Sequence, residues 1–388
     1  MAYNFDLVPN RRTAGALNKW TFFPKDVLPM WIADMDFSAP PPILEALHKY
    51  IEHGDLGYRL PSAKLYETIA ARMHSLYGWT ISADMIVAVA GVNSGYNAAA
   101  RTFCTPERGY LIQTPVYNEF HETRRKTGMP QVEAPLAKKI QGNQISYEVD
   151  FDSLERGAQN ASLFLLCNPH NPVGSIYSPA ELKRMAKICI ENDVLIVSDE
   201  IHSEILLENH RFRPIASLSR EIEKRTITLL SASKAFNVPG LFCAFAVIPN
   251  KKLREQYVET ILKMGMHVGS TGLVAAQIAY SGRCDKWLKA LREYLTGNRD
   301  FLLAYVTKYM PEVRITVPDA TYLAWLDYTQ MDLEKTPYEF FFEKAKVALS
   351  EGAIFGENGK KHVRLNFGTS RRILKQGLDR MNKALHSL

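Results

Sequence analysis

Side chains that can bind or transform a small molecule follow several apolar segments of this sequence, at the point where each segment ends. The clearest case is Lys234, which comes after the segment 226–230 with Ser231 and Ser233 before it. A lysine amine can bond covalently to a carbonyl carbon, and serine hydroxyls can donate hydrogen bonds to an anion. Taken alone, a Ser-x-Ser-Lys sequence is more typical of a solvated turn.

Four other apolar segments end in comparable side chains. These are Asn93 after 85–90, Tyr117 after 110–113, Asn171 after 163–167, and Asp199 with His202 after 194–198. Each has an ordinary alternative interpretation: Asp199 can cap a helix, His202 can be a packed histidine, and Asn171-Pro172 and Tyr117 can belong to turns. Their joint order on successive segments favours one shared binding site over five separate turns.

The segments that carry these residues predict a mostly parallel sheet covered by helices. They are continuous apolar runs at 85–90, 110–113, 163–167, 194–198, 226–230 and 243–248. Helical patterns lie between them, such as 179–191 with apolar residues three and four positions apart. Ligands of open parallel sheets bind beyond the carboxyl ends of the strands, so we expect the side chains above to line one crevice.

The length and the change of pattern along the chain predict two domains and an N-terminal arm. We expect the arm over 1–45, a large α/β domain over 46–285, and a smaller α+β domain over 286–388 on which the arm packs. In the smaller domain the patterns predict a long helix over 287–309 and strands at 322–326 and 362–367. Further helices are predicted over 337–349 and 372–386.

Composition excludes several classes of protein. The 388 residues are 46% hydrophobic and 23% charged, with a net charge of +6 spread along the chain, so we expect no nucleic-acid partner. No apolar stretch is long enough for a membrane span, and no secretory signal is visible. The five cysteines are odd in number and unpaired in spacing, which predicts free thiols, no metal site and a cytoplasmic location.

Six motifs resemble the fold-type-I pyridoxal 5′-phosphate (PLP) family, the aspartate-aminotransferase-like enzymes. They are LPMWIADMDF at 28–37, Gly57-Tyr58, NPHNPVG at 168–174, SDEIH at 198–202, SASKAFN at 231–237 and VRLNF at 363–367. The resemblance covers the chain from end to end. Within the family it points to the branch of C–S lyases similar to cystathionine β-lyase and cystalysin.

The resemblance implies a role for each strand-end residue. Lys234 would hold PLP covalently and, once displaced by a substrate amine, remove the Cα proton. Asp199 would keep the pyridine nitrogen protonated. Asn171 and His202 would lie near the ring oxygen, and Tyr117 would stack on the ring.

The resemblance also implies how the two anionic groups are held. The amides of Val92 and Asn93, the hydroxyls of Ser231 and Ser233, and Tyr58 from the partner subunit of a homodimer would hold the phosphate. The arginine that aminotransferases carry eight residues after the lysine is Phe242 here, which leaves Arg59 as a candidate cation. Arg364, with the backbone near Ala33, would bind the carboxylate of an amino-acid substrate.

Several functions are compatible with these residues. The C–S lyase branch implies β-elimination of a cysteine S-conjugate such as L-cystathionine, to a thiol, ammonia and pyruvate. An aminotransferase is the alternative. β-Substitution or cyclisation on the same scaffold also stays open, as does a PLP-binding regulatory protein, for which the sequence has no helix-turn-helix or basic arm. Some lyases of this branch carry a second tyrosine beside the stacking one. Asn118 stands there instead, so Tyr117, Lys234 or water must protonate the leaving thiolate.

Overall fold

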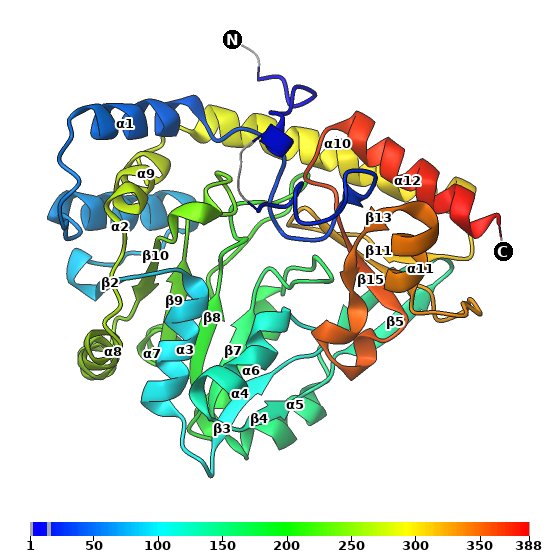
Figure 1. Cartoon of the computed structure of the whole chain (residues 1–388). Helices are drawn as coiled ribbons and strands as arrows, with labels where there is room; N and C mark the ends of the chain where they lie inside the picture. Colours follow the sequence, from blue (N-terminus) through cyan, green and yellow to red (C-terminus); the bar gives the residue numbers. More distant parts are fainter. Residues whose placement is uncertain (1–2, 14–16, 388) are drawn as a thin grey trace.

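The larger of two main sheets is mostly parallel in the computed structural model, which describes residues 3–13 and 17–387 (Figure 1). Within that part of the chain, its strand order is β2-β10-β9-β8-β7-β3-β4. The strands are β2 (Ile86–Val89), β3 (Gly109–Ile112), β4 (Gln131–Glu133), β7 (Ala161–Cys167), β8 (Leu195–Asp199), β9 (Thr226–Leu230) and β10 (Ala244–Val247). Only β10 runs antiparallel to its neighbours. The predicted sheet is therefore confirmed.

Helices cover both faces of this sheet, as the continuous apolar strands predict. Side chains of β7 alternate between two layers, with Leu163 and Leu165 in the layer of α3 and α8, and Phe164 and Leu166 in that of α5 and α6. The helices are α1 (Pro41–Glu52), α2 (Ala63–Tyr77), α3 (Val92–Phe103), α4 (Asn118–Thr127), α5 (Phe151–Ala158), α6 (Pro179–Glu191), α7 (Arg220–Lys224), α8 (Lys251–Lys263), α9 (Ser270–Tyr280), α10 (Asp285–Tyr309), α11 (Pro337–Phe340) and α12 (Arg371–Leu385).

A second, mixed sheet lies beside the first, and α10 (yellow) extends across the top of the molecule toward α12 (red) in Figure 1. The strand order of this second sheet in the described chain is β14-β15-β12-β11-β6-β5. The strands are β5 (Ala137–Gln141), β6 (Gln144–Glu148), β11 (Arg314–Thr316), β12 (Leu323–Asp327), β14 (Ser350–Glu351) and β15 (His362–Asn366). The β5–β6 hairpin lies within 46–285, the range predicted for the large domain, yet β6 pairs with β11.

The helix predicted over 337–349 is wrong in its second half. Helix α11 ends at Phe340, a π-helical turn covers Phe341–Ala345, and Lys346 has a positive φ of 53°. The chain then forms β13 (Val347–Ala348), which pairs in parallel with β1 (Leu28–Pro29) of the N-terminal arm. Val347 and Ala348, which the apolar pattern assigned to a helix, are buried in this strand instead. Their partner strand lies more than 300 residues away in sequence.

Two asparagines hold the segment after β1 between the two sheets. Asn366, at the end of β15, donates from Nδ2 to the carbonyls of Ile32 (2.6 Å) and Asp34 (2.9 Å). Asn237, three residues after Lys234, donates to the carbonyls of Met35 and Phe37 at 3.0 and 2.6 Å. Because both ends of this short segment are bonded, its carbonyl groups have fixed positions beside Lys234.

The loop after β8 is fixed by a buried ion pair. The Nε of Arg72 on α2 donates to Glu204 Oε1 at 2.9 Å, and Arg72 Nη1 donates to Asp285 Oδ1 at 3.0 Å. A buried guanidinium with carboxylate partners constrains the backbone that carries them. The loop includes His202.

In the described part of the chain, no helix has the length and apolar character needed to cross a membrane.

Candidate active site

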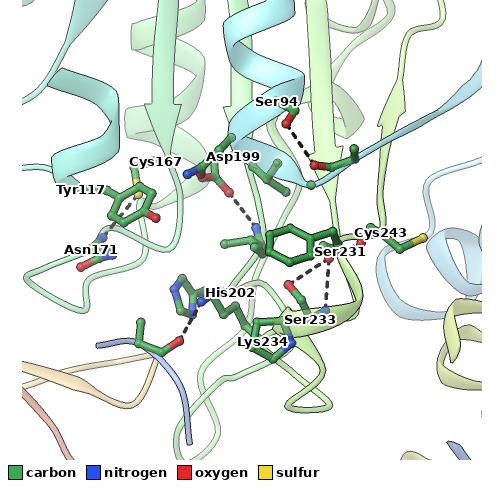
Figure 2. Close-up of a pocket in the computed structure, with 18 residues that line it drawn as sticks. Ser94, Tyr117, Cys167, Asn171, Asp199, His202, Ser231, Ser233, Lys234 and Cys243 are labelled. Atoms are coloured by element: carbon green, nitrogen blue, oxygen red, sulfur yellow. Dashed lines mark hydrogen bonds between the residues drawn. The ribbon is translucent and has the colours of Figure 1, made fainter. Parts of the chain in front are cut away.

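A cavity of about 220 Å³ opens at the carboxyl ends of the parallel strands (Figure 2). Ten of the predicted site residues line it: Ala33, Val92, Asn93, Tyr117, Asn171, Asp199, His202, Ser231, Ser233 and Lys234. They come from five strand ends and from the N-terminal arm. Strand β10 runs the other way, so the residues before it, Phe242 and Cys243, reach the same edge.

One end of the cavity is built from backbone amides and hydroxyls. Gly91 precedes α3 with a φ of 95°, and the helix begins at Val92, so the first amides of α3 have no carbonyl of the preceding turn to bind. Ser231 Oγ lies 2.7 Å from the carbonyl oxygen of Cys243 and 3.0 Å from Ser233 Oγ. Donors of this kind at a helix N-terminus suit a phosphate group.

Asp199 is a buried carboxylate at the end of β8. Its Oδ1 accepts from the amide of Ile201 at 3.0 Å, and no lysine, arginine or histidine of the described chain lies within ion-pair distance. Burial raises the pKa of Asp199 to about 6, against the opposing effects of the Ile201 amide and the Lys234 charge. A cationic ring nitrogen beside this carboxylate would compensate for its burial.

Lys234 points into the cavity from the turn after β9. Its Nζ donates to the carbonyl oxygen of Ala33 at 2.7 Å. Burial lowers the pKa of Lys234 to about 8, and the Arg364 charge acts in the same direction, while Asp34 and Asp199 oppose both. The amine is therefore neutral in a larger share of molecules near pH 7 than an ordinary lysine, and a neutral amine is the nucleophile.

Three further side chains surround the space between Asp199 and Lys234 (Figure 2). The buried His202 has an unpartnered Nδ1, and burial lowers its pKa well below the usual value, so the imidazole is neutral. Tyr117 precedes α4, and burial raises its pKa to about 12. Asn171 Oδ1 accepts from Arg364, which leaves its amide nitrogen free to donate elsewhere.

Arg364 lies next to the cavity rather than in its lining. Nη1 donates to Asn171 Oδ1 at 3.1 Å, and Nη2 donates to the Trp31 carbonyl at 2.9 Å and to Ser350 Oγ at 3.0 Å. The guanidinium has no carboxylate partner among the described residues, and burial lowers its pKa to about 10. A buried cation held only by neutral groups suits an incoming carboxylate.

Tyr58 and Arg59 lie outside this cavity in the chain described. Tyr58 is fully exposed, in the loop between α1 and α2. Arg59 pairs with Asp55 at 2.9 Å and lies over the Tyr50 ring. Phe242, which stands where a cation was expected, lines the cavity and is 67% exposed. Among the described lining residues, Lys234 is the sole lysine or arginine.

The donor set fits PLP. The Lys234 amine, with its lowered pKa, matches the aldehyde, a buried carboxylate without a cationic partner matches the pyridine nitrogen, and the amides of α3 with Ser231 and Ser233 match the phosphate. The buried Arg364 suits the carboxylate of an amino acid. The fold and this constellation define a PLP-dependent enzyme.

Known proteins agree with this class. Residues 26–381 match the family model of aminotransferase class I and II. Cystathionine beta-lyase PatB of Bacillus subtilis (strain 168) is 35% identical over 364 residues, which cover 93% of each chain. The structure of cystalysin from Treponema denticola, with PLP, superposes at a TM-score of 0.93 with 31% identity over the whole of both chains. The PLP-bound C–S lyase of Staphylococcus hominis superposes at 0.91 with 30% identity, covering 99% of this chain and 98% of that one.

The chain belongs to the aminotransferase class I and II family and lies in its branch of C–S lyases and cystathionine β-lyases. The predicted family, the aspartate-aminotransferase-like fold and the PLP cofactor are thereby confirmed. The roles of the individual residues stay predictions that the geometry supports.

The sequence did not indicate the residues that hold the Ala33 segment and Arg364 in place by hydrogen bonds. Asn237 and Asn366 stand inside the motifs SASKAFN and VRLNF, so their positions were visible, but only the fold shows that both bind the segment carrying Ala33. Ser350 and the Trp31 carbonyl hold Arg364, and no spacing in the sequence connects these residues.

The lowered pKa of Lys234 predicts how the apoenzyme takes up its cofactor. The rate constant for formation of the visible cofactor band on adding PLP should rise with pH and level off above about 8, because the neutral amine is the reacting form. Stopped-flow absorbance between pH 6 and 10 measures this profile, with Lys234→Ala protein as the blank. A rate that still climbs toward 10.5, the ordinary value for lysine, would contradict the assignment.

Proposed function

We propose that this enzyme cleaves cysteine S-conjugates by β-elimination, giving a thiol, ammonia and pyruvate with the uptake of water. The observation that carries the proposal is the buried guanidinium of Arg364, without a carboxylate partner, next to a cavity in which Lys234 is the one lysine or arginine among the described lining residues. One carboxylate binds at Arg364, and apart from Lys234 the described lining residues offer no cation for a second. A thioether side chain suits this arrangement better than a dicarboxylic amino acid does.

The residues of the site then have the following tasks. Arg364 binds the α-carboxylate and orients the Cα–H bond of the substrate. Lys234, displaced by the substrate amine, takes the Cα proton. When bound, PLP supplies the electron sink that makes this proton acidic. Asp199 keeps the ring nitrogen protonated, because a buried carboxylate without another partner favours a neighbouring cation.

The leaving sulfur needs a proton or a compensating charge. Asn118, the neighbour of Tyr117, is too weak an acid to provide one. Tyr117 keeps its own proton because burial raises its pKa to about 12, so it can donate a hydrogen bond to the sulfur. Lys234 carries a proton after it has deprotonated Cα. Tyr117 and Lys234 both line the cavity, and we assign the proton transfer to Lys234.

An aminotransferase is the alternative, because the family model spans these enzymes and the first steps need the same residues. The two activities differ in what happens after Cα deprotonation. A thiolate leaves Cβ far more readily than hydrogen or carbon does. The names of the similar proteins, PatB, cystalysin and the staphylococcal enzyme, support the lyase.

Incubation with L-cystathionine and no keto acid separates the two activities. A lyase releases homocysteine and pyruvate in equal amounts over many turnovers, and thiol and pyruvate assays follow both products. Transamination of L-alanine should be at least ~10²-fold slower, a difference of about 2.7 kcal/mol in barrier. If thiol release stops near one equivalent per site and 2-oxoglutarate restarts it, the enzyme is an aminotransferase.

We further propose a homodimer in which Tyr58 completes the partner's phosphate site. Tyr58 belongs to an exposed loop whose Gly57 carbonyl accepts from Ser270 at the start of α9. The same helix turn touches Leu241, since Gly272 packs on the Leu241 carbonyl. The loop and the segment before β10 therefore both contact the start of α9, and the exposed side chains of Leu56, Leu60 and Phe242 on these two segments support an interface between copies.

Hybrid dimers test this arrangement. Lys234→Ala and Tyr58→Ala homodimers should each be inactive or nearly so. After subunit exchange, half the dimers are mixed and each has one intact site, so activity should return to about a quarter of the wild-type value. Native mass spectrometry verifies the exchange. A fully active Tyr58→Ala homodimer, or no recovery in proven hybrids, refutes the shared site.

The thiols support a reducing compartment, and a cytoplasmic location follows as part of the proposal. All five cysteines are free and buried, and Cys167 and Cys243 line the cofactor cavity. Intracellular enzymes keep such thiols reduced.

A further inference from the structure

The backbone carbonyl of Ala33 accepts two hydrogen bonds at the edge of the cavity. Lys234 Nζ donates to it at 2.7 Å, and Tyr322 Oη donates to it at 2.9 Å. A carbonyl oxygen has two lone pairs, so both bonds can form together. The amine of the lysine and the phenol thus share one acceptor.

This acceptor cannot move away from the two donors. The neighbouring carbonyls of Ile32 and Asp34 both bind Asn366, and the amide of Asp34 binds the Ile32 carbonyl at 2.8 Å. Because the Ala33 carbonyl is fixed, the strength of its hydrogen bond to Lys234 depends on whether Tyr322 also donates to it.

Tyr322 is held as firmly as the carbonyl that it contacts. Its side chain is 1% exposed, its ring meets the edge of His202 with centroids 5.8 Å apart, and its backbone carbonyl accepts from Phe367 at 2.8 Å. Burial raises the pKa of Tyr322 well above its usual value, with Asp34 acting in the same direction, so the phenol stays protonated and always donates.

We propose that Tyr322 is a positioning residue which, by sharing the Ala33 carbonyl, limits how tightly that carbonyl holds the Lys234 ammonium after the substrate has displaced the lysine from PLP. An acceptor already bound to one donor binds the next donor less strongly. The released lysine is then held at a defined place but can still give up its proton. The inference deepens the proposed function and rests on Lys234 removing the Cα proton, a step that lyase and aminotransferase share.

Four other titratable groups lie around Lys234. They are Asp34 from the arm, Asp199 from β8, Arg364 from β15 and the neutral His202, and Tyr322→Phe alters none of these side chains. Tyr117 and Arg364 also face Tyr322. The substitution Tyr322→Phe keeps the ring against His202 and removes only the bond to Ala33.

Exchange of the Cα proton of L-alanine in D2O measures the step by itself, because L-alanine has no leaving group at Cβ. With PLP-loaded Tyr322→Phe enzyme at saturating L-alanine, we expect the pH profile of exchange, followed by NMR, to shift to higher pH. At pH 7 the rate should fall by about two- to fourfold, because losing the second donor strengthens the bond of Ala33 to the ammonium by a fraction of its worth, while the plateau at high pH is retained. Thiol release from L-cystathionine tests the lyase activity separately.

A second readout and a matched variant separate positioning from damage. While PLP holds Nζ covalently, no ammonium donates to Ala33, so the pH titration of the visible cofactor band without substrate should be unchanged. Tyr328→Phe is the control: its hydroxyl is buried and has no hydrogen-bond partner in the described structure, so both measurements should match the wild type. An unshifted exchange profile, a lowered plateau, or a shifted band titration in Tyr322→Phe overturns the inference.

Discussion

A parallel sheet presents the carboxyl ends of its strands along one edge, and the rest of this active site depends on that constraint. Strands β2, β3, β7, β8 and β9 all end there, so residues scattered over more than 140 positions of the sequence line one cavity. The helices on both faces make the strands rigid. Only the antiparallel β10 breaks the rule, and it brings Phe242 to the place where a cation for the phosphate would otherwise be expected.

Three charged side chains around the cavity have no oppositely charged partner within ion-pair distance in the described chain. They are Asp199 and Lys234 at this edge and Arg364 from β15 of the second sheet, and burial shifts the pKa of each toward its neutral form. Burying an unpaired charge is costly, so such an arrangement persists where binding supplies what is missing. The pyridine nitrogen, the aldehyde and a substrate carboxylate are each matched by one of the three. These unpaired charges lower the stability of the free protein, and they leave the site already arranged to bind its ligands.

Much of this could be predicted from sequence, because strand ends and motifs are local signals. The run Thr226–Leu230 with Lys234 after it, and helix Pro179–Glu191, lie where the patterns place them. Long-range pairing could not be predicted. The β5–β6 hairpin joins the second sheet, and Val347–Ala348 form a strand because Leu28–Pro29 lie beside them. For the same reason the sequence shows that Tyr322 is aromatic but not that it shares the Ala33 carbonyl with Lys234.

The central claim is that the Lys234 amine is the covalent attachment point of PLP. Borohydride reduction of the purified holoenzyme, followed by proteolysis and mass spectrometry, tests it most directly. We expect loss of the visible cofactor band and a phosphopyridoxyl group on the peptide that contains Lys234, with no such adduct in Lys234→Ala protein treated in the same way. A stoichiometric adduct on any other lysine would contradict the assignment of the site and the mechanism built on it.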